Sequence, residues 1–161
     1  MDNDVISKAI ADFKEHELSE HRERMAVLST TCTIPNCILK GRPTAAKEEF
    51  IMRLHSVIPK LNGCTTFSDI LDVCYDSFAS IKGIGDLTIT RFAEYAAFIR
   101  DVDMEASCYL AFLSKDAKKH LAAAGIIEEN RLQLGSTKSY LEDLSYSEII
   151  TFLNSHYTLF S

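Results

Sequence analysis

The chain has 161 residues, the usual size of one domain and enough to bury a core without disulfides or metal ions as staples. With 47% hydrophobic and 25% charged residues, three prolines and six glycines, its composition excludes a disordered or linker-rich chain. The net charge of −6 opposes a broad attraction to nucleic acid or anionic lipid, so any nucleic-acid site has to be local. We expect a single helical domain over residues 1–161.

The N-terminal half predicts helices separated by a clear break. Apolar residues recur at mostly helical spacing over residues 5–28, although the middle of this stretch is polar on nearly every side. It predicts a long or broken helix, a candidate to protrude and pack against a partner. Residues 29–43 carry two prolines and a glycine and predict a loop. A further helix begins after Pro43 and is expected to end near Pro59.

Two amphipathic helices with a very tight connection are predicted between residues 66 and 100. Thr66 or Ser68 caps the first helix, which stops at Lys82-Gly83, and the second helix restarts the apolar pattern from Thr88.

The remaining segment continues the helical pattern. Residues 104–113 predict a buried helix, and Ser114 opens a capped helix that ends at Gly125. The stretch after Gly125 is the one place where a short strand or an irregular connection is expected. The last helix begins with the capping-box pattern Ser145 to Glu148. The fold class is therefore all-α, a compact domain of six to eight helices.

Composition and cysteine content predict the compartment. No run approaches the roughly 20 consecutive apolar residues that cross a bilayer, and the charged start lacks the apolar core of a signal peptide. The five cysteines are odd in number and widely spaced, which is typical of free thiols in a reducing compartment. We expect a cytoplasmic protein that binds no membrane.

A specific motif lies between Phe78 and Phe92, where the chain reads FASIKGIGDLTITRF. Two apolar positions precede Gly83-Ile84-Gly85, which leads into a helix. This pattern resembles the helix-hairpin-helix motif over about fifteen residues. In such a motif glycines permit positive φ and close backbone approach, the apolar residue between them plugs the hairpin, and N–H groups at the start of the second helix can hold a phosphate.

The resemblance implies a nucleic-acid-binding site made of Lys82, Gly83, Ile84, Gly85, Thr88 and Arg91, with Lys82 and Arg91 as the nearest cations. Two departures weaken it. Ile89 stands where the motif has a small alanine, which implies looser or shifted helix packing. Asp86 and Leu87 stand where many members have basic or neutral polar residues, and an acid beside an anion site weakens binding. A plain tight turn between packed helices is the competing interpretation.

An enzymatic interpretation also follows from the resemblance. Some helix-hairpin-helix proteins are DNA glycosylases, in which a Val-Asp pair follows the hairpin; here this pair is Val102-Asp103. Asp103 is thus a weak catalytic candidate, and a helix N-cap or first-turn acid is the alternative. Leu87 occupies the lysine position of the lyase-active members, which excludes their Schiff-base chemistry there, and the family's iron–sulfur cysteines are absent. The sequence favours a non-catalytic protein over an enzyme.

Cys32 and Cys37 flank a proline turn and could supply two thiolates to zinc if His55, Cys64 or another residue completed the site. A matching second pair is missing, and free thiols in or beside the core are the alternative. We expect no metal and no cofactor.

The sequence therefore predicts a non-catalytic nucleic-acid-associated protein that contacts the phosphate backbone without reading sequence. Its expected partner is DNA, bound non-specifically. The alternative is an acidic helical protein–protein interaction module whose partner the sequence does not identify.

Overall fold

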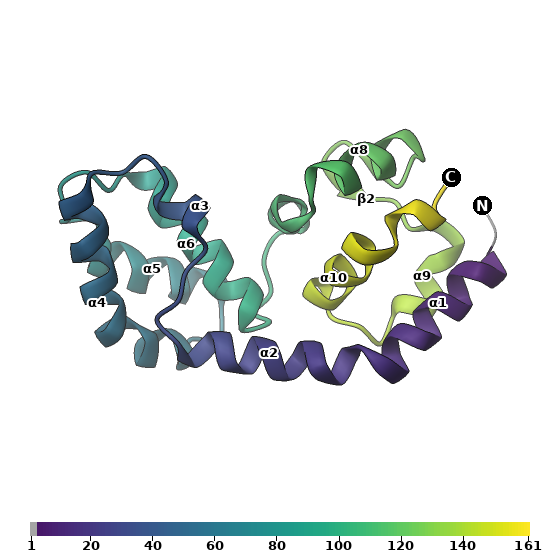
Figure 1. The fold of residues 1–161 in the computed structure, drawn as a ribbon, viewed down its shortest axis with the longest axis horizontal. Helices are drawn as coiled ribbons and strands as arrows, with labels where there is room; N and C mark the ends of the chain where they lie inside the picture. The colour runs from purple at the N-terminus through teal and green to yellow at the C-terminus, as the bar shows by residue number, and fades with distance from the viewer. Residues whose placement is uncertain (1–2) are drawn as a thin grey trace. The chain divides into compact units, whose positions relative to one another are not determined.

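A computed structural model, which describes residues 3–161, confirms the all-α fold class (Figure 1). Within that range there are ten α-helices, three of them only four residues long, and one two-stranded sheet. The chain divides into two compact units. One contains the N-terminal segment up to Arg22 together with residues 104–161, and the other contains residues 23–103. The expectation of one domain over the whole chain stays a prediction.

Most helices lie where the sequence predicts them, with two differences. A short helix, Asn36–Leu39, lies within residues 29–43, where the sequence predicts a loop, and the first helix of the hairpin ends at Phe78 rather than at Lys82-Gly83. Along the first part of the chain the helices are α1 (Asn3–His16), α2 (Leu18–Thr30), α3 (Asn36–Leu39), α4 (Thr44–Asn62), α5 (Phe67–Phe78) and α6 (Asp86–Ile99). After them come α7 (Ala106–Tyr109), α8 (Lys115–Ala123), the antiparallel strands β1 (Ile127–Glu128) and β2 (Arg131–Leu132), α9 (Lys138–Leu141) and α10 (Tyr146–His156). The strands lie in the stretch after Gly125, where the sequence predicts either a short strand or an irregular connection. Residues 104–113 form α7 and a 3₁₀ turn rather than one helix.

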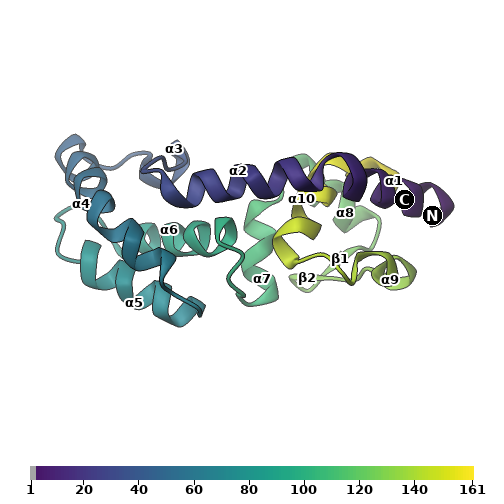
Figure 2. The ribbon, with the colours of Figure 1, turned by 90° about the horizontal axis from the view of Figure 1, so that it is seen from below.

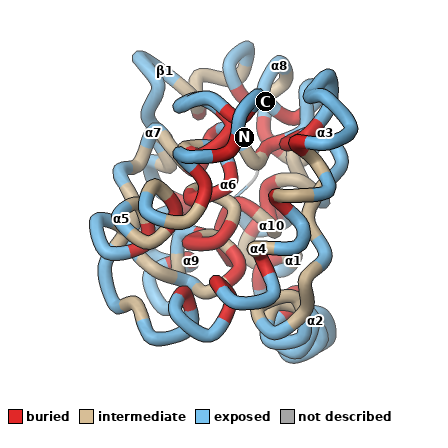
Figure 3. Tube along the Cα trace, turned by 90° about the vertical axis from the view of Figure 1, so that its left-hand side faces the viewer, coloured by how far each residue is buried: buried red, intermediate tan, exposed pale blue. Residues whose placement is uncertain are grey.

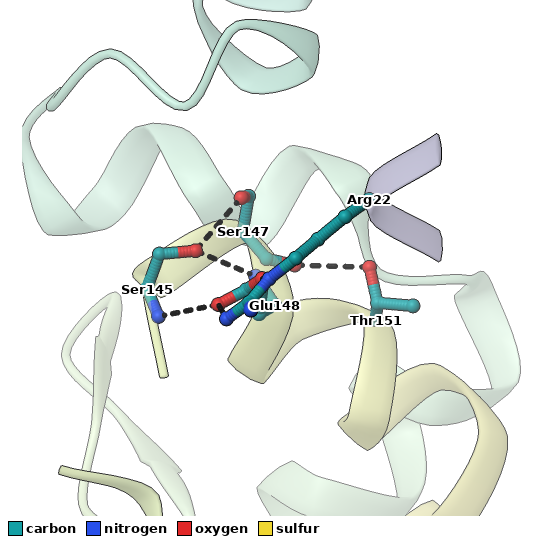
Figure 4. A network of polar contacts seen from close by, with 5 residues as sticks. All are labelled: Arg22, Ser145, Ser147, Glu148 and Thr151. Atoms are coloured by element: carbon teal, nitrogen blue, oxygen red, sulfur yellow. Dashed lines mark hydrogen bonds and ion pairs between the residues drawn. The ribbon is translucent and has the colours of Figure 1, made fainter. Parts of the chain in front are cut away.

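Three helices begin at the predicted polar caps. The side chain of Thr66 accepts a hydrogen bond from the backbone N–H of Asp69 at the start of α5, and Ser114 caps α8 in the same way. At α10 the predicted capping box is complete, because Ser145 and Glu148 each bond the other's backbone N–H (Figure 4). Each cap satisfies N–H groups that a helix start leaves without partners.

The N-terminal helix is broken at Glu17, between α1 and α2. It was a candidate to protrude, but α1 instead packs on α9 and α10 and buries Ile6, Ile10 and Phe13. These three residues recur every three to four positions and so share one helix face. In α2 Leu18 and His21 are buried, and most of the helix is exposed (Figure 3).

α4 does not end near Pro59, as the sequence predicted, but continues to Asn62. A proline lacks the N–H that would bond the carbonyl four residues earlier, so a single helical hydrogen bond is lost. This loss is tolerated because Ile58 and Leu61, in the same turn, are buried in the core.

The core of residues 23–103 is built from α4, α5 and α6, with α5 packed against both of the others (Figure 2). Phe50 stacks on Phe78 with ring centroids 3.9 Å apart, and Phe92 meets both rings edge-on at 5.2 and 5.5 Å. Phe78 and Phe92 are the outer apolar positions of the motif, so the motif is part of this core.

The other unit has its own core around α10. Phe152 meets Phe13 of α1 edge-to-face at 5.5 Å, and Leu121 of α8 and Leu141 of α9 are fully or almost fully buried. Along the helices buried faces alternate with exposed ones, the pattern of helices packed on one side (Figure 3). Across residues 3–161, no helix combines the length and apolar character that crossing a membrane requires.

Candidate nucleic-acid interface

The connection between α5 and α6 spans residues 79–85 and contains hydrogen bonds between backbone groups three residues apart. The N–H of Ile81 bonds the carbonyl of Phe78 at 3.1 Å, and the N–H of Ile84 bonds the carbonyl of Ile81 at 3.2 Å. Both isoleucine side chains are buried. The side chain of Ile84 therefore faces the core rather than solvent. Ile89 is also buried, with 1% of its surface exposed, so the core accommodates the larger side chain.

The two glycines of the motif have different roles. Gly83 has φ +96°, and a Cβ there would lie 3.2 Å from side-chain atoms of both Pro43 and Ala46 at the start of α4. Gly83 therefore needs both positive φ and close approach. Gly85 has φ −105° and no atom within 4 Å of an added Cβ, so the expectation of positive φ is wrong for this residue. Its surroundings are open.

The N-terminus of α6 begins directly after Gly85, and no side chain caps it. The first N–H groups of a helix have no partner within the helix, and they carry its positive dipole end. Thr88 is buried, so it would meet a phosphate through its backbone N–H rather than its hydroxyl. Asp86 is exposed in the first turn, and Leu87 beside it is 64% exposed.

A cavity of about 110 Å³ opens at this helix start. It is lined by Cys37, Ile38, Lys40, Arg42, Gly85, Leu87, Thr88 and Arg91. α3 packs against α6, and this contact brings the residues just after α3 to the hairpin. Three cations, Lys40, Arg42 and Arg91, therefore line one small cavity at a positive helix end. This arrangement can neutralise and orient a phosphate group.

Sequence reasoning found only part of this set. Of the predicted residues, Gly85, Thr88 and Arg91 line the cavity. Lys82 and Gly83 are exposed and Ile84 is buried, and none of the three is among its lining residues. Lys40 and Arg42 are outside the predicted set, because the sequence predicts only a loop for the segment that contains them. Their positive charge was the available signal, but no sequence spacing connects them to the hairpin.

Acidic groups limit the positive potential of this site. Asp86 is exposed in the first turn of α6, next to the free N–H groups. On the same helix Glu94 is half-buried; burial raises the pKa of its carboxyl, and Arg91 has the opposite, smaller effect. Arg91 therefore interacts with an acid as well as facing the cavity. The site is locally cationic on a chain that is acidic as a whole.

The glycosylase candidate Asp103 is an exposed loop residue between α6 and α7. It does not line the hairpin cavity. The alternative that it caps a helix is wrong, because Glu105 holds the N-cap position of α7.

One cysteine of the pair considered as zinc ligands contacts one of the residues considered as a further ligand. Cys32 Sγ lies 3.0 Å from Nδ1 of His55 on α4. Within residues 3–161, however, no three or more His, Cys, Asp or Glu side chains gather in a way that could hold a metal ion.

Comparisons with known proteins add no relative. No protein-family model matches the chain, and neither the curated proteins nor the solved structures contain a match.

Proposed function

We propose that this protein is a non-catalytic nucleic-acid-associated protein that contacts the phosphate backbone through its helix-hairpin-helix-like segment without reading sequence. The observation that carries the proposal is the placement of Lys40, Arg42 and Arg91 around the uncapped start of α6. A helix start offers N–H groups and a positive dipole, and the cations add charge-assisted hydrogen bonds. Contacts of this kind position a protein on the backbone and carry no sequence information.

The expected affinity is modest and strongly salt-dependent. Each neutralised phosphate contributes about −0.9 to the slope of log affinity against log salt, so three cations predict a slope of about −2 to −3. The net charge of −6 opposes binding outside this site.

The competing function is a protein–protein interaction module. It is favoured by exposed apolar side chains such as Met52, which is 69% exposed, and Val27, which is 60% exposed. Binding through an apolar centre depends much less on salt.

Fluorescence anisotropy with short double- and single-stranded DNA, at low and then moderate salt, tests the proposal. The decisive variant is Gly85→Glu, because the open space and negative φ at Gly85 admit a side chain without strain. It places a carboxylate at the anion site. The matched control is Ala122→Glu, an identical change of charge at an exposed position of α8.

We expect salt-dependent binding that Gly85→Glu abolishes and Ala122→Glu preserves. Arg42→Ala and Arg91→Ala should each weaken binding several-fold and reduce the salt slope by about one. Absence of binding at low salt would discard the nucleic-acid function and leave the protein–protein module, to be pursued by partner capture. Equal losses in both glutamate variants would show that binding follows net charge and not this site.

A further inference from the structure

A second cavity, of about 660 Å³, lies where the segment before α3 passes α4. Its walls include the apolar side chains of Ile34, Pro35, Leu39 and Ile51. Two thiols, Cys32 and Cys37, and two ammonium groups, Lys40 and Lys47, also line it. The cavity thus combines nucleophiles, cations and an apolar surface, within a volume that suits a small organic molecule.

One thiol in this cavity has a base against it. Cys32 Sγ lies 3.0 Å from Nδ1 of His55. α4 presents Lys47, Ile51 and His55 at intervals of four residues, so these side chains share one helix face. The first two line the cavity, and the third contacts the thiol that lines it. An imidazole within hydrogen-bond distance can take the proton of a thiol and so generate the thiolate, which is the reactive species.

We propose that Cys32 is a nucleophilic thiol, activated by His55, that forms a mixed disulfide with small anionic disulfides of the glutathione type. The carboxylates of such a molecule match Lys40 and Lys47, and its aliphatic parts match the apolar walls. This cavity shares Cys37 and Lys40 with the cavity at the start of α6, but the thiol chemistry proposed here does not depend on the proposed nucleic-acid function.

The exchange balances without a further oxidant. His55 accepts the proton from Cys32, and the Cys32 sulfur attacks one sulfur of the disulfide. A new sulfur–sulfur bond forms to Cys32 while the original one breaks. The departing thiolate takes up a proton and leaves as a thiol. The Cys32 sulfur is oxidised and the leaving sulfur is reduced by the same amount.

Cys37 provides an internal comparison, because it lines the same cavity and is more exposed than Cys32. Accessibility alone would therefore make Cys37 react first. The test treats the reduced full-length protein with oxidised glutathione near neutral pH, quenches with acid and locates the adduct by peptide mass spectrometry. We expect Cys32 to react about tenfold faster than Cys37, because of the adjacent base.

His55→Ala should slow mixed-disulfide formation at Cys32 about tenfold, since the base is removed, and should leave the reaction rate of Cys37 unchanged. His55 is exposed, so this change leaves the core intact. His16→Ala, at an exposed histidine of α1, is the matched control and should change neither rate. Lys47→Gln should slow the reaction of Cys32 with oxidised glutathione but not its reaction with the uncharged 2-hydroxyethyl disulfide. Faster reaction at Cys37, or no effect of His55→Ala, would overturn the activated thiol; equal effects of Lys47→Gln on both reagents would overturn the anionic ligand.

Discussion

Arg100 Nη2 donates a hydrogen bond of 2.9 Å to the carbonyl oxygen of Ser29, and so joins the end of α6 to the last turn of α2. The same guanidinium donates through Nε to Asn62 Oδ1, at the end of α4, and through Nη1 to the carbonyl of Ala96. Three helix C-termini therefore meet at one cation. This arrangement is favourable because helix C-termini carry free carbonyls and negative dipole ends.

Arg100→Ala should lower the free energy of unfolding by about 2 to 3 kcal/mol, since it removes three hydrogen bonds from a charged donor, two of them part-buried. Arg100→Lys keeps the charge but not the planar set of donors, and should lose roughly half as much. Chemical denaturation measures both. Arg24→Ala, at an exposed arginine of α2, is the control. A loss at Arg100 no larger than at Arg24 would contradict the structural role.

The two hairpin glycines should respond differently to alanine. Gly83→Ala combines a φ of +96° with contacts of 3.2 Å to Pro43 and Ala46, so we expect it to cost about 1 to 3 kcal/mol of stability. Gly85→Ala meets neither constraint and should change stability by less than about 0.5 kcal/mol. Thermal or urea unfolding distinguishes them, and equal costs at both positions would be inconsistent with the backbone described for this turn.

Glu148 should make stability pH-dependent. Burial raises the pKa of its carboxyl, but the hydrogen bonds from Arg22 and Ser145 together outweigh burial and hold the pKa below its ordinary value of 4.5 (Figure 4). A group with a depressed folded pKa stabilises the fold above its unfolded pKa, and this contribution is lost as pH falls through the folded value. The stability advantage of wild type over Glu148→Gln should therefore be largest near neutral pH.

That advantage should shrink as the pH falls from about 5 toward 3, measured by urea denaturation at each pH. Glu142→Gln, an exposed acid in the same part of the chain, is the control and should show little difference at any pH. A wild-type advantage that does not change with pH would refute the ionic role of Glu148.

Cys74 should be the least reactive thiol of the folded protein. Its side chain is fully buried in α5, and burial, with a smaller contribution from Cys64, raises its pKa to about 12. Very little thiolate then exists near pH 8, and reagents cannot reach it. Maleimide labelling of native protein, read by mass spectrometry, should leave Cys74 unmodified while exposed Cys37 reacts. Unfolded protein should label at all five cysteines. Rapid native labelling of Cys74 would show that α5 opens.

Helix positions and caps could be predicted from the sequence because they depend on neighbouring residues. The hydroxyls of Thr66, Ser114 and Ser145 each bond an N–H three residues later, within reach of the local chain alone. The predicted helix end at Pro59 is wrong for a different reason. Local preference favours a helix end at this proline, but burial of Leu61 in the core stabilises one more turn of α4. Boundaries fail where tertiary packing overrides local preference.

Only some residues of each candidate site could be predicted from the sequence. The pattern of glycines and apolar residues identified the hairpin and Arg91, but Lys40 and Arg42 join it only because α3 packs on α6. The contact of Cys32 with His55 spans 23 residues, and the ion pair of Arg22 with Glu148 spans 126. No periodic pattern encodes such distances along the chain.

By itself, therefore, the sequence determined the all-α class, the caps and the apolar faces that pack into two cores, because each follows from spacings of three or four residues. The tertiary structure alone decided which cations surround the start of α6 and which thiol meets a base. Those pairings depend on where separate helices come together, and many different helix arrangements can bury the same apolar faces.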